Sequence, residues 1–483
     1  MSGAEGFSRR ALIGGGLALA AMPAFAATPS RKVVGLKGIQ YGTAERFMAP
    51  KAAPWGMVDI ATLQAFCPTC PQQNSRYAPA SEECLYLNLW APKGKPKRLR
   101  PVMVYFHGGA YSTGSVTDPL NDGAALAEHG DVVVVTVNHR LNALGYLYLA
   151  RLDPRFPDSG NAGQLDLIIA LQWVQEFIAA FGGDPKNVTV FGQSGGGAKI
   201  ATLMAMPAAK GLFHKAITMS GQQVTASGPI NATKRAEAFL ERLGKGVDPA
   251  TAPVEQIIAA LSALDPILGG GVYMGPVMDM RNLHRHPFWP GATPQSLGIP
   301  MMLGNTVSET RAFYAADSKQ LSGLSLDNLA SRIATEMRID AHPEWVVGEF
   351  RKHYPDATPL NLFHRIVTAA RSWRGQVEEA ETRARAGAPA FVYQLDFEDA
   401  KHTDDIGLAF GTVPNPSVTQ KAMSAQMMDA FVHFARTGNP GWSSYNLKAR
   451  QTMVFDTNSR MVSDPRKWER ELFAAIPYVQ PGS

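Results

Sequence analysis

Short, unbroken hydrophobic runs alternate along this chain with longer stretches in which hydrophobic residues recur at helical spacing. The runs at residues 102–106 (VMVYF) and 132–137 (VVVVTV) are rich in β-branched and aromatic residues. Such runs are typical of parallel strands that are buried on both faces. Four further strands are predicted at residues 188–191, 213–219, 301–304 and 389–397.

Between these runs, hydrophobic residues lie three and four positions apart. From Asn161 to Phe181 this spacing predicts a helix, and Gly182-Gly183-Asp184-Pro185 predicts its end. Residues 197–206 (GAKIATLMAM) predict another helix. Strands that alternate with helices form a mostly parallel sheet covered by helices on both faces, so the expected fold class is α/β.

Two long stretches depart from this alternation. Residues 222–300 and 310–387 are rich in helical patterns and poor in strand signals, so we expect them to leave the sheet and roof an active site. The chain shows no internal repeat and no linker. We therefore expect a single domain over residues 27–483.

Composition and charge narrow the possible partners. The chain has 483 residues, 45% of them hydrophobic, and a net charge of +5 that is spread along its length. Nucleic-acid binding usually requires a clustered basic patch, so no nucleic-acid partner is expected. His284 and His286, in HRHP, lack a third ligand, and neither a metal nor a cofactor is expected.

The first 26 residues have the pattern of an export signal. Arg9-Arg10 precedes the apolar run ALIGGGLALAAMPAF, and Ala24-Phe25-Ala26 offers a cleavage site between small residues. The paired arginines resemble a bacterial twin-arginine signal. We expect a periplasmic or secreted protein without stable membrane insertion after cleavage, because no later stretch is long and apolar enough to span a bilayer. An N-terminal membrane anchor is the alternative.

An exported chain can form disulfides, and this one has three cysteines, Cys67, Cys70 and Cys84. Cys67 and Cys70 have C-x-x-C spacing, which also fits a redox dithiol or half a zinc site. Because no second metal-type pair exists, one bridge to Cys84 is the favoured interpretation.

The segment FGQSGGGAK, residues 191–199, lies between a predicted strand and a predicted helix and fits two motifs. Residues 192–196 match G-x-S-x-G, in which a tight turn holds a nucleophilic serine above a sheet. The glycines also come within one residue of a phosphate-binding loop. That second match fails because Ala198 follows Gly197 and Ile200 follows Lys199, which leaves no hydroxyl for Mg²⁺. A nucleotide-binding protein is thus only a rival hypothesis.

A nucleophilic serine needs backbone donors for the oxyanion and a base for its proton. His107-Gly108-Gly109-Ala110 directly follows a predicted strand, where such donors are expected. The base must be one of eleven histidines, and position alone does not choose among them.

Several motifs together resemble one family. They are HGGAYSTGS, VNHRL, FGGDPKNVTVFGQSGGG, GLFHKAITMSG, KHTDDIGLAFG and FARTGNPGW, with SEECLYLNLW similar to a second signature of that family. From about residue 38 to residue 442 the chain resembles the type-B carboxylesterase (cholinesterase-like) family of α/β-hydrolases. The resemblance implies the α/β-hydrolase fold and a serine hydrolase that cleaves small carboxylic esters through an acyl-enzyme intermediate.

The resemblance also implies roles for individual residues. Ser194 matches the nucleophile, His402 the general base and Glu309 the acid that orients this base. Their chain order agrees with that of α/β-hydrolases. Because Ser308 and Thr310 replace the usual neighbours of the acid, the alternative acids are Asp404 and Asp405.

Backbone donors and a disulfide are implied in the same way. The N–H groups of Gly109, Ala110 and Gly195 match the oxyanion hole, and Cys70 and Cys84 match the N-terminal disulfide of the family. Ala110 replaces a glycine but keeps its N–H, and Gly195 stands where alanine is usual.

Two further residues are unexplained by the resemblance. Gln193 stands where the family usually has Glu. Lys199 falls near the start of a predicted helix, where the helix dipole disfavours a cation. Its side chain either pairs with a buried acid or reaches solvent, and neither interpretation is favoured.

The sequence says little about the substrate. Four aromatic residues near the motifs either line an apolar pocket or belong to the core: Tyr111, Phe313, Tyr314 and Phe410. Residues 71–83 lack the cation-binding tryptophan of cholinesterases, so short aliphatic or aryl esters are expected in place of choline esters. A non-catalytic binding protein on the same fold is the alternative function. The oligomeric state is not indicated.

Overall fold

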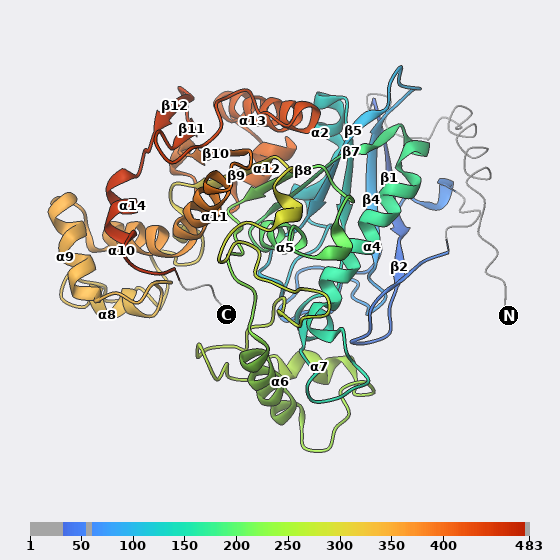
Figure 1. The fold of residues 1–483 in the computed structure, drawn as a ribbon, viewed down its shortest axis with the longest axis horizontal. Coiled ribbons are helices and arrows are strands. Elements are labelled where there is room, and N and C mark those ends of the chain that lie inside the picture. Colours follow the sequence, from blue (N-terminus) through green and yellow to red (C-terminus); the bar gives the residue numbers. More distant parts are fainter. Residues whose placement is uncertain (1–31, 55–59, 479–483) are drawn as a thin grey trace.

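The computed structural model describes residues 32–54 and 60–478. The predicted export signal at residues 1–26 lies outside the described residues. A ten-stranded sheet runs through the molecule in the order β1-β4-β6-β5-β7-β8-β9-β10-β11-β12 (Figure 1). Its strands are β1 Val33–Gln40, β4 Tyr86–Pro92, β5 Arg100–Phe106, β6 Val133–Val137, β7 Gly183–Gln193, β8 Lys215–Met219, β9 Met301–Thr306, β10 Ala390–Leu395, β11 Gln451–Phe455 and β12 Arg460–Ser463. Strands β2 (Gly42–Thr43) and β3 (Lys51–Ala52) form a separate small sheet.

The helices are inserted between the strands, as the alternating pattern predicts. They are α2 Ala124–Gly130, α3 Asn142–Tyr146, α4 Ala162–Phe177, α5 Gly195–Leu203, α6 Pro229–Leu243, α7 Val254–Ala260, α8 Leu329–Ala334, α9 Pro343–His353, α10 Pro359–Thr368, α11 Arg374–Arg385, α12 Asp404–Phe410, α13 Val418–Thr437 and α14 Lys467–Phe473.

The six predicted strands all form, and neighbours from β6 through β5 and β7 to β11 pair in parallel. The α/β fold class is thereby confirmed. The sheet ends in antiparallel pairs, β1 with β4, β4 with β6, and β11 with β12. Of these strands, β1, β4, β11 and β12 were not predicted; the edge strand β1 (VVGLKGIQ), for example, carries polar residues and glycines in place of an unbroken hydrophobic run.

Among the predicted boundaries, the start of β7 differs most from the structure. Strand β7 begins at Gly183, five residues before the predicted start, because Gly183 already pairs with Arg100 of β5. The preceding helix ends at Phe177, and a 3-10 turn at Ile178–Phe181 carries the chain directly into the strand. The Gly-Gly-Asp-Pro sequence thus ends this 3-10 turn and also begins the strand.

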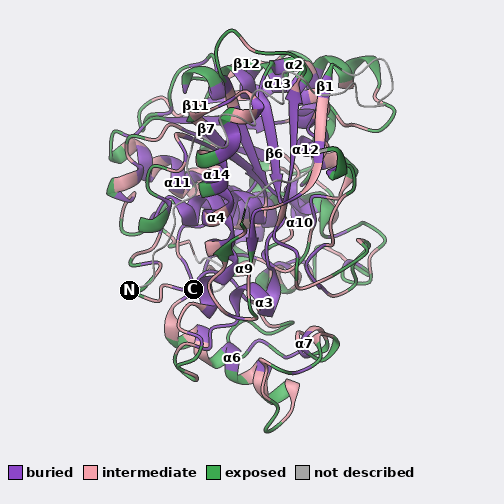
Figure 2. Cartoon of the chain, turned by 90° about the vertical axis from the view of Figure 1, so that its right-hand side faces the viewer, coloured by how far each residue is buried: buried purple, intermediate pink, exposed green. Residues whose placement is uncertain are grey.

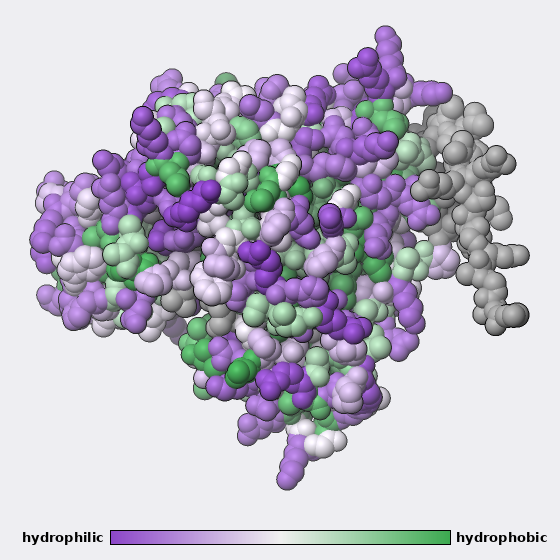
Figure 3. All heavy atoms as spheres, viewed as in Figure 1, coloured by the Kyte–Doolittle hydropathy of each residue, from purple (hydrophilic) through white to green (hydrophobic). Residues whose placement is uncertain are grey.

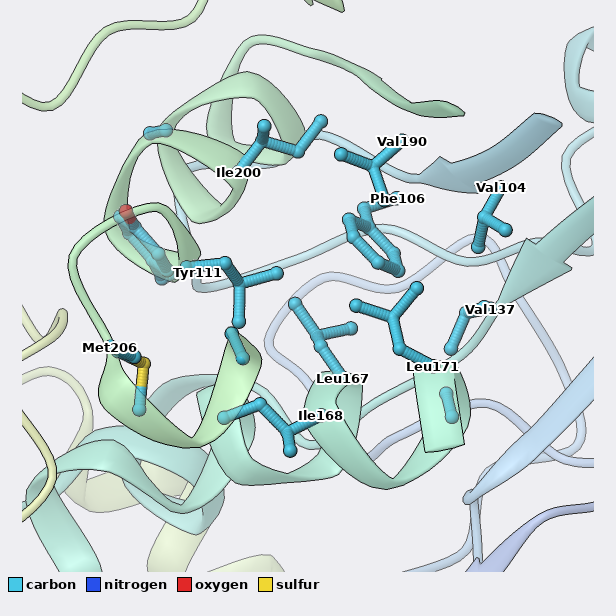
Figure 4. Packing of buried hydrophobic residues seen from close by; sticks show 14 of the residues in the cluster. Val104, Phe106, Tyr111, Val137, Leu167, Ile168, Leu171, Val190, Ile200 and Met206 are labelled. Atoms are coloured by element: carbon cyan, nitrogen blue, oxygen red, sulfur yellow. The ribbon is translucent and has the colours of Figure 1, made fainter. Parts of the chain in front are cut away.

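Successive residues of each central strand face opposite sides of the sheet, so the molecule has a hydrophobic core on each side. On one side, strand residues pack against α4 and α5, as Figure 4 shows for Val104 and Val190 with Leu167 and Leu171. On the other side, the strands pack against α2, α12 and α13. Figure 2 shows that the central strands are buried, whereas edge strand β1 is only partly covered.

Both long stretches between strands are helical, as predicted. Helices α6 and α7 lie between β8 and β9 and project from one end of the molecule, whereas α8 to α11 lie between β9 and β10 (Figure 1). Residues of α8, α9, α10 and α14 share a hydrophobic cluster of their own. On the face seen in Figure 3, hydrophobic residues are scattered among hydrophilic ones, with several in the lower part beside α6.

Within residues 32–54 and 60–478, the segment Ser159–Phe181 is the one helix that is long and apolar enough to cross a membrane, with a mean hydropathy of 1.2. The expectation that no such stretch follows the signal is therefore wrong on length and composition. The segment contains α4, and 61% of its most apolar window is buried against the rest of the protein. Its apolar character is that of a core helix.

Candidate active site

Ser194 lies at a sharp turn between β7 and α5. Its φ is 54°, a value that residues other than glycine rarely adopt, and its N–H donates to the Met219 carbonyl at 2.7 Å. This turn presents the serine at the carboxyl end of β7, in the middle of the sheet. It is the geometry in which a G-x-S-x-G sequence holds a reactive serine.

Two glycines allow α5 to approach the loop that follows β5. A Cβ atom at Gly196 would overlap the Phe106 carbonyl oxygen, and a Cβ at Gly195 would lie 2.7 Å from the Ala110 nitrogen. A larger residue at either position would force a backbone to move. The glycines therefore serve a close contact between two backbone segments, as a nucleophile turn requires, and do not form the cradle of a phosphate.

Glu309 and His402 form a buried pair. Glu309 follows β9 at the start of the 3-10 helix Glu309–Ala312, and His402 lies just before α12. The Nδ1 of His402 donates a short hydrogen bond to Oε2 of Glu309. The other carboxylate oxygen, Oε1, accepts from the Ser220 hydroxyl at 2.5 Å and from the Thr306 N–H at 2.8 Å. The carboxylate is thus fixed from three directions.

These contacts keep the carboxylate charged. Burial raises the pKa of Glu309, but the charge of His402 and the hydrogen bonds from His402, Ser220 and Thr306 bring it below its ordinary value. The opposite ring nitrogen, His402 Nε2, is buried and has no hydrogen-bond partner among the described residues, so it does not bond to Ser194. It is free to accept a proton, and such bonds often form only when substrate is present.

The alternative acids lie elsewhere. Asp404 accepts the Lys401 N–H at 3.0 Å, and Asp405 is buried beside the Tyr393 hydroxyl at 3.5 Å. Burial, with the Glu309 charge as a second cause, raises the pKa of Asp405 to about 7. The structure therefore places Glu309, and neither aspartate, on the imidazole ring.

Ser220 and Gly221 connect the serine turn to the acid; both end the motif GLFHKAITMSG, but neither was assigned a role from the sequence. Ser220 bonds to Glu309, and a Cβ atom at Gly221 would overlap the carbonyl oxygen of Ser194. The available signal was a Ser-Gly pair directly after the predicted strand at residues 213–219. Side chains at the carboxyl ends of neighbouring parallel strands meet at the same edge of a sheet.

The loop after β5 turns back beside Ser194. Gly109 and Ala110 have φ values of 94° and 50°, which orient their peptide groups differently from those of a strand. In the described part of the chain, the N–H groups of Gly109, Ala110 and Gly195 donate to no other group. The N–H of Gly195 is free because this residue begins helix α5. Three unused donors are thus brought close together next to the serine.

A cavity of about 540 Å³ opens beside this loop. Its lining includes Gly109 of the oxyanion loop together with Gln193 and Thr403, the chain neighbours of Ser194 and His402. Gln193 is buried, and its Nε2 has no partner within the described residues. The remaining lining is largely polar, with Arg76 and Asp118 joined in an ion pair. The volume is in the range of small-ligand sites.

The four candidate aromatic residues have different surroundings. The Phe313 ring lies 4.8 Å from the His402 ring and is 44% exposed, so it borders the site. Phe410 packs in the core against Tyr105 and is not a pocket residue. Tyr314 bonds to Glu336. Tyr111 is buried, and its hydroxyl donates to Gln223 at 2.9 Å.

Lys199 satisfies neither of the two expectations for it. It is fully buried, and no carboxylate pairs with it within the ranges that the structure describes. Its Nζ donates to the His107 carbonyl at 3.2 Å.

Of the two histidines in HRHP, His286 accepts the Ala226 N–H at 3.1 Å, and His284 contacts the Arg281 carbonyl at 3.1 Å.

The structure has Cys67, Cys70 and Cys84 as free thiols, so it does not contain the predicted disulfide. Cys70 and Cys84 are nevertheless buried neighbours. A hydrogen bond with Cys70, and then burial, raises the pKa of Cys84 well above its ordinary value. The pairing of these two thiols is thus compatible with the fold, and the disulfide stays a prediction.

A mostly parallel sheet, a strained serine turn and an acid–histidine pair at its carboxyl edge together define an α/β-hydrolase of the serine hydrolase type. The chain belongs to the carboxylesterase family, which it matches over residues 26–473. It is 33% identical to the para-nitrobenzyl esterase of Bacillus subtilis (strain 168), over 90% of this chain and 94% of that relative.

Solved structures agree with this membership. A carboxylesterase of Geobacillus stearothermophilus superposes with a TM-score of 0.81 at 34% identity, covering 92% of this chain and 97% of that one. An esterase from Clostridium hathewayi, described as able to hydrolyse aliphatic aromatic polyesters, gives 0.74 at 31% identity, covering 92% and 95%. The predicted family, the α/β-hydrolase fold and the hydrolysis of carboxylic esters are thereby confirmed.

Proposed function

We propose that this carboxylesterase uses Ser194 as nucleophile, His402 as general base and Glu309 as the acid that orients His402. The observation that carries the proposal is the buried Glu309–His402 pair at the carboxyl end of the strands, where the Ser194 turn also lies; His402 Nε2 has no hydrogen-bond partner among the described residues. An ionised carboxylate on Nδ1 fixes the tautomer in which Nε2 can accept the serine proton.

The reaction then follows in two steps. Ser194 Oγ bonds to the ester carbonyl carbon while its proton moves to His402 Nε2, and the carbonyl oxygen becomes an oxyanion. The N–H groups of Gly109, Ala110 and Gly195 stabilise this oxyanion. The carbon–oxygen bond to the alcohol breaks, and the alcohol takes the proton from Nε2. Water, activated by His402, releases the acid in the same way and restores the serine.

We propose short-chain or aryl esters as substrates. A cavity of about 540 Å³ beside the oxyanion loop accommodates a small substituent, and Phe313 offers an apolar ring next to His402. The name of the para-nitrobenzyl esterase relative supports an ester whose alcohol part carries an aromatic ring. Choline esters are disfavoured because Asp118, the carboxylate of the cavity, is already paired with Arg76 and Tyr77.

The test compares hydrolysis of p-nitrophenyl esters of increasing chain length by the wild-type protein and by Ser194→Ala. The wild type is expected to prefer short chains, and the variant to lose several orders of magnitude in kcat at an unchanged melting temperature. A variant as active as the wild type would overturn the role of Ser194. A preference for choline esters or long acyl chains would overturn the proposed substrate class alone.

We also propose that the chain is exported and that the Cys70–Cys84 disulfide forms after export. The paired arginines, the apolar run and the small residues at positions 24–26 support export, and contact between the two buried thiols supports the pairing. Cell fractionation with mass measurement of the mature protein tests both. A full-length protein with three thiols in the cytoplasm would contradict the proposal.

A further inference from the structure

Lys199 is a buried cation that the mechanism above does not use. It lies in the second turn of helix α5 and has no exposed surface. Burial without a counter-ion disfavours a charged group, and the positive end of a helix dipole disfavours it further. The stability of the fold therefore does not account for a lysine at this position.

The contacts of Lys199 join both ends of the loop after β5. Its Nζ donates to the carbonyl oxygen of His107 at 3.2 Å and lies 5.1 Å from the centre of the Tyr111 ring. Between these two residues the loop carries Gly109 and Ala110, whose N–H groups donate to no group in residues 32–54 and 60–478. A single side chain thus contacts the loop on either side of two candidate oxyanion donors.

The same helix supplies the third donor. Gly195 lies one helical turn before Lys199, so the two residues occupy one face of α5. This face packs against the loop, because a Cβ atom at Gly195 would lie 2.7 Å from the Ala110 nitrogen. Lys199 therefore lies at the contact between the two backbone segments that must stay in register for the three N–H groups to converge.

We propose that Lys199 is a positioning residue of the oxyanion hole, whose ammonium group fixes the loop from His107 to Tyr111 against α5 and whose positive charge favours the developing oxyanion. The inference rests on the oxyanion hole proposed above. It explains why a buried cation is kept where the helix dipole disfavours it. Donors that are fixed before the reaction need no rearrangement when the charge develops.

The groups around Lys199 leave it as the one that titrates near neutral pH. Burial lowers the pKa of Lys199 to about 7. From the loop after β5, His107 has a pKa lowered to about 3, mainly by burial and then by the Lys199 charge. His139, which follows β6, has a pKa well below its ordinary value, mainly because of burial and then because of the Lys199 charge. Burial raises the pKa of the Tyr111 hydroxyl well above its ordinary value. From α4, the neutral Gln164 donates to the Lys199 carbonyl.

The test uses an alkyl trifluoromethyl ketone on the full-length protein and on Lys199→Met, a neutral side chain of similar length. The serine oxygen adds to this ketone, the ketone π bond opens to an oxyanion, and the serine proton moves to His402. Below the pKa of Lys199, the inhibition constant of K199M is expected to rise about 10- to 100-fold, less than the roughly 10²- to 10³-fold found when an oxyanion donor itself is removed, because Lys199 only positions the donors. The corresponding methyl ketone, which forms no stable adduct, is expected to bind both proteins equally.

Lys215→Met is the matched control. Lys215 is also a largely buried lysine, but it lies at the opposite end of strand β8 and bonds to Asn187. K215M is expected to keep the wild-type inhibition constants. If K199M does not fold, Lys199→Gln replaces it, since its amide can still donate to the His107 carbonyl without a charge. Equal inhibition of the Lys199 variant and K215M would overturn the inference.

The pH profile separates positioning of the donors from a purely structural role. In the wild type and K215M, kcat/KM is expected to decline on the alkaline side as Lys199 loses its proton, and in K199M this decline is expected to disappear. A decline that is the same in all three proteins would contradict the inference. Activity in Ser194→Ala would instead indicate that the proposed active site is wrong. The Ser194 variant thus distinguishes a failure of the proposed function from a failure of the Lys199 inference alone.

Discussion

At the scale of single residues, the site depends on how each group is held by its neighbours. Glu309 is fixed by the Ser220 hydroxyl and the Thr306 N–H, and His402 is fixed by Glu309. The orientation of the imidazole, and therefore the availability of Nε2, follows from these hydrogen bonds. Ser220 affects the reaction only through Glu309, so it is a positioning residue.

Replacing Glu309 with Gln tests the role of the acid. The neutral amide cannot stabilise the imidazolium and can favour the wrong tautomer, so kcat is expected to fall on the order of 10³- to 10⁴-fold. Steady-state hydrolysis of a p-nitrophenyl ester measures the loss. Glu336→Gln, at a carboxylate that bonds to Tyr314 outside the site, is the control and is expected to keep wild-type activity. A small effect of E309Q would favour another acid.

The same carboxylate predicts a dependence of stability on pH. The pKa of Glu309 is lower in the folded protein than in the unfolded chain, so its stabilising contribution is present above the unfolded pKa and lost as pH falls through the folded one. Melting temperatures measured from neutral to acidic pH should fall more steeply for the wild type than for E309Q. Parallel curves would show that Glu309 is not held as a buried, ionised group.

At the scale of the elements, the contact between α5 and the loop after β5 is the critical packing. A Cβ atom at Gly196 would overlap the Phe106 carbonyl oxygen, so Gly196→Ala must displace the helix that carries Gly195 and follows Ser194. We expect lower stability, by about 1–3 kcal/mol as for other overpacked sites, and a large loss of activity.

Thermal unfolding and ester hydrolysis of G196A measure these two effects. Gly298→Ala is the control, because a Cβ atom there meets open space, and its stability is expected to change by less than about 0.5 kcal/mol. Wild-type stability and activity of G196A would show that the helix and the loop are not in such close contact.

The elements also show what sequence alone can predict. The central strands were predictable because strands buried on both faces leave unbroken hydrophobic runs, such as VVVVTV in β6. Edge strands β1 and β12 leave no such run. The serine turn has a local motif, but Glu309 and His402 lie 93 residues apart, and only the family resemblance brought them together. Ser220 and the contacts of Lys199 depend on packing between elements and were not predicted.

At the scale of the whole molecule, the sheet joins the two hydrophobic cores and the two helical excursions, residues 222–300 and 310–387. The two excursions contact each other beside the oxyanion loop. Gln223 of the first excursion donates its N–H to Glu379 of the second at 2.6 Å, and also accepts the Tyr111 hydroxyl next to the oxyanion loop. Burial raises the pKa of Glu379 to about 8, so this contact involves a carboxyl group that is largely protonated near neutral pH.

The proposed disulfide belongs to this scale, because it closes a loop whose two ends, Cys70 and Cys84, lie in the hydrophobic core. Oxidised protein is expected to lose the mass of two hydrogens, and reduction is expected to lower its stability by on the order of 3 kcal/mol. Mass spectrometry measures the mass difference, and thermal melting with and without reductant measures the change in stability. Cys67→Ser should keep the difference and Cys84→Ser should abolish it. If reductant changes the stability of neither the wild type nor Cys67→Ser, the Cys70–Cys84 pairing is contradicted.

The central claim is that ester hydrolysis proceeds through Ser194, and trapping the acyl-enzyme tests it most directly. The protein is mixed with a p-nitrophenyl ester, quenched, digested and analysed by mass spectrometry. We predict an acyl group on Ser194 in the peptide that contains FGQSGGGAK, and none in Ser194→Ala. An acyl group on another residue, or continued hydrolysis by S194A, would contradict the account.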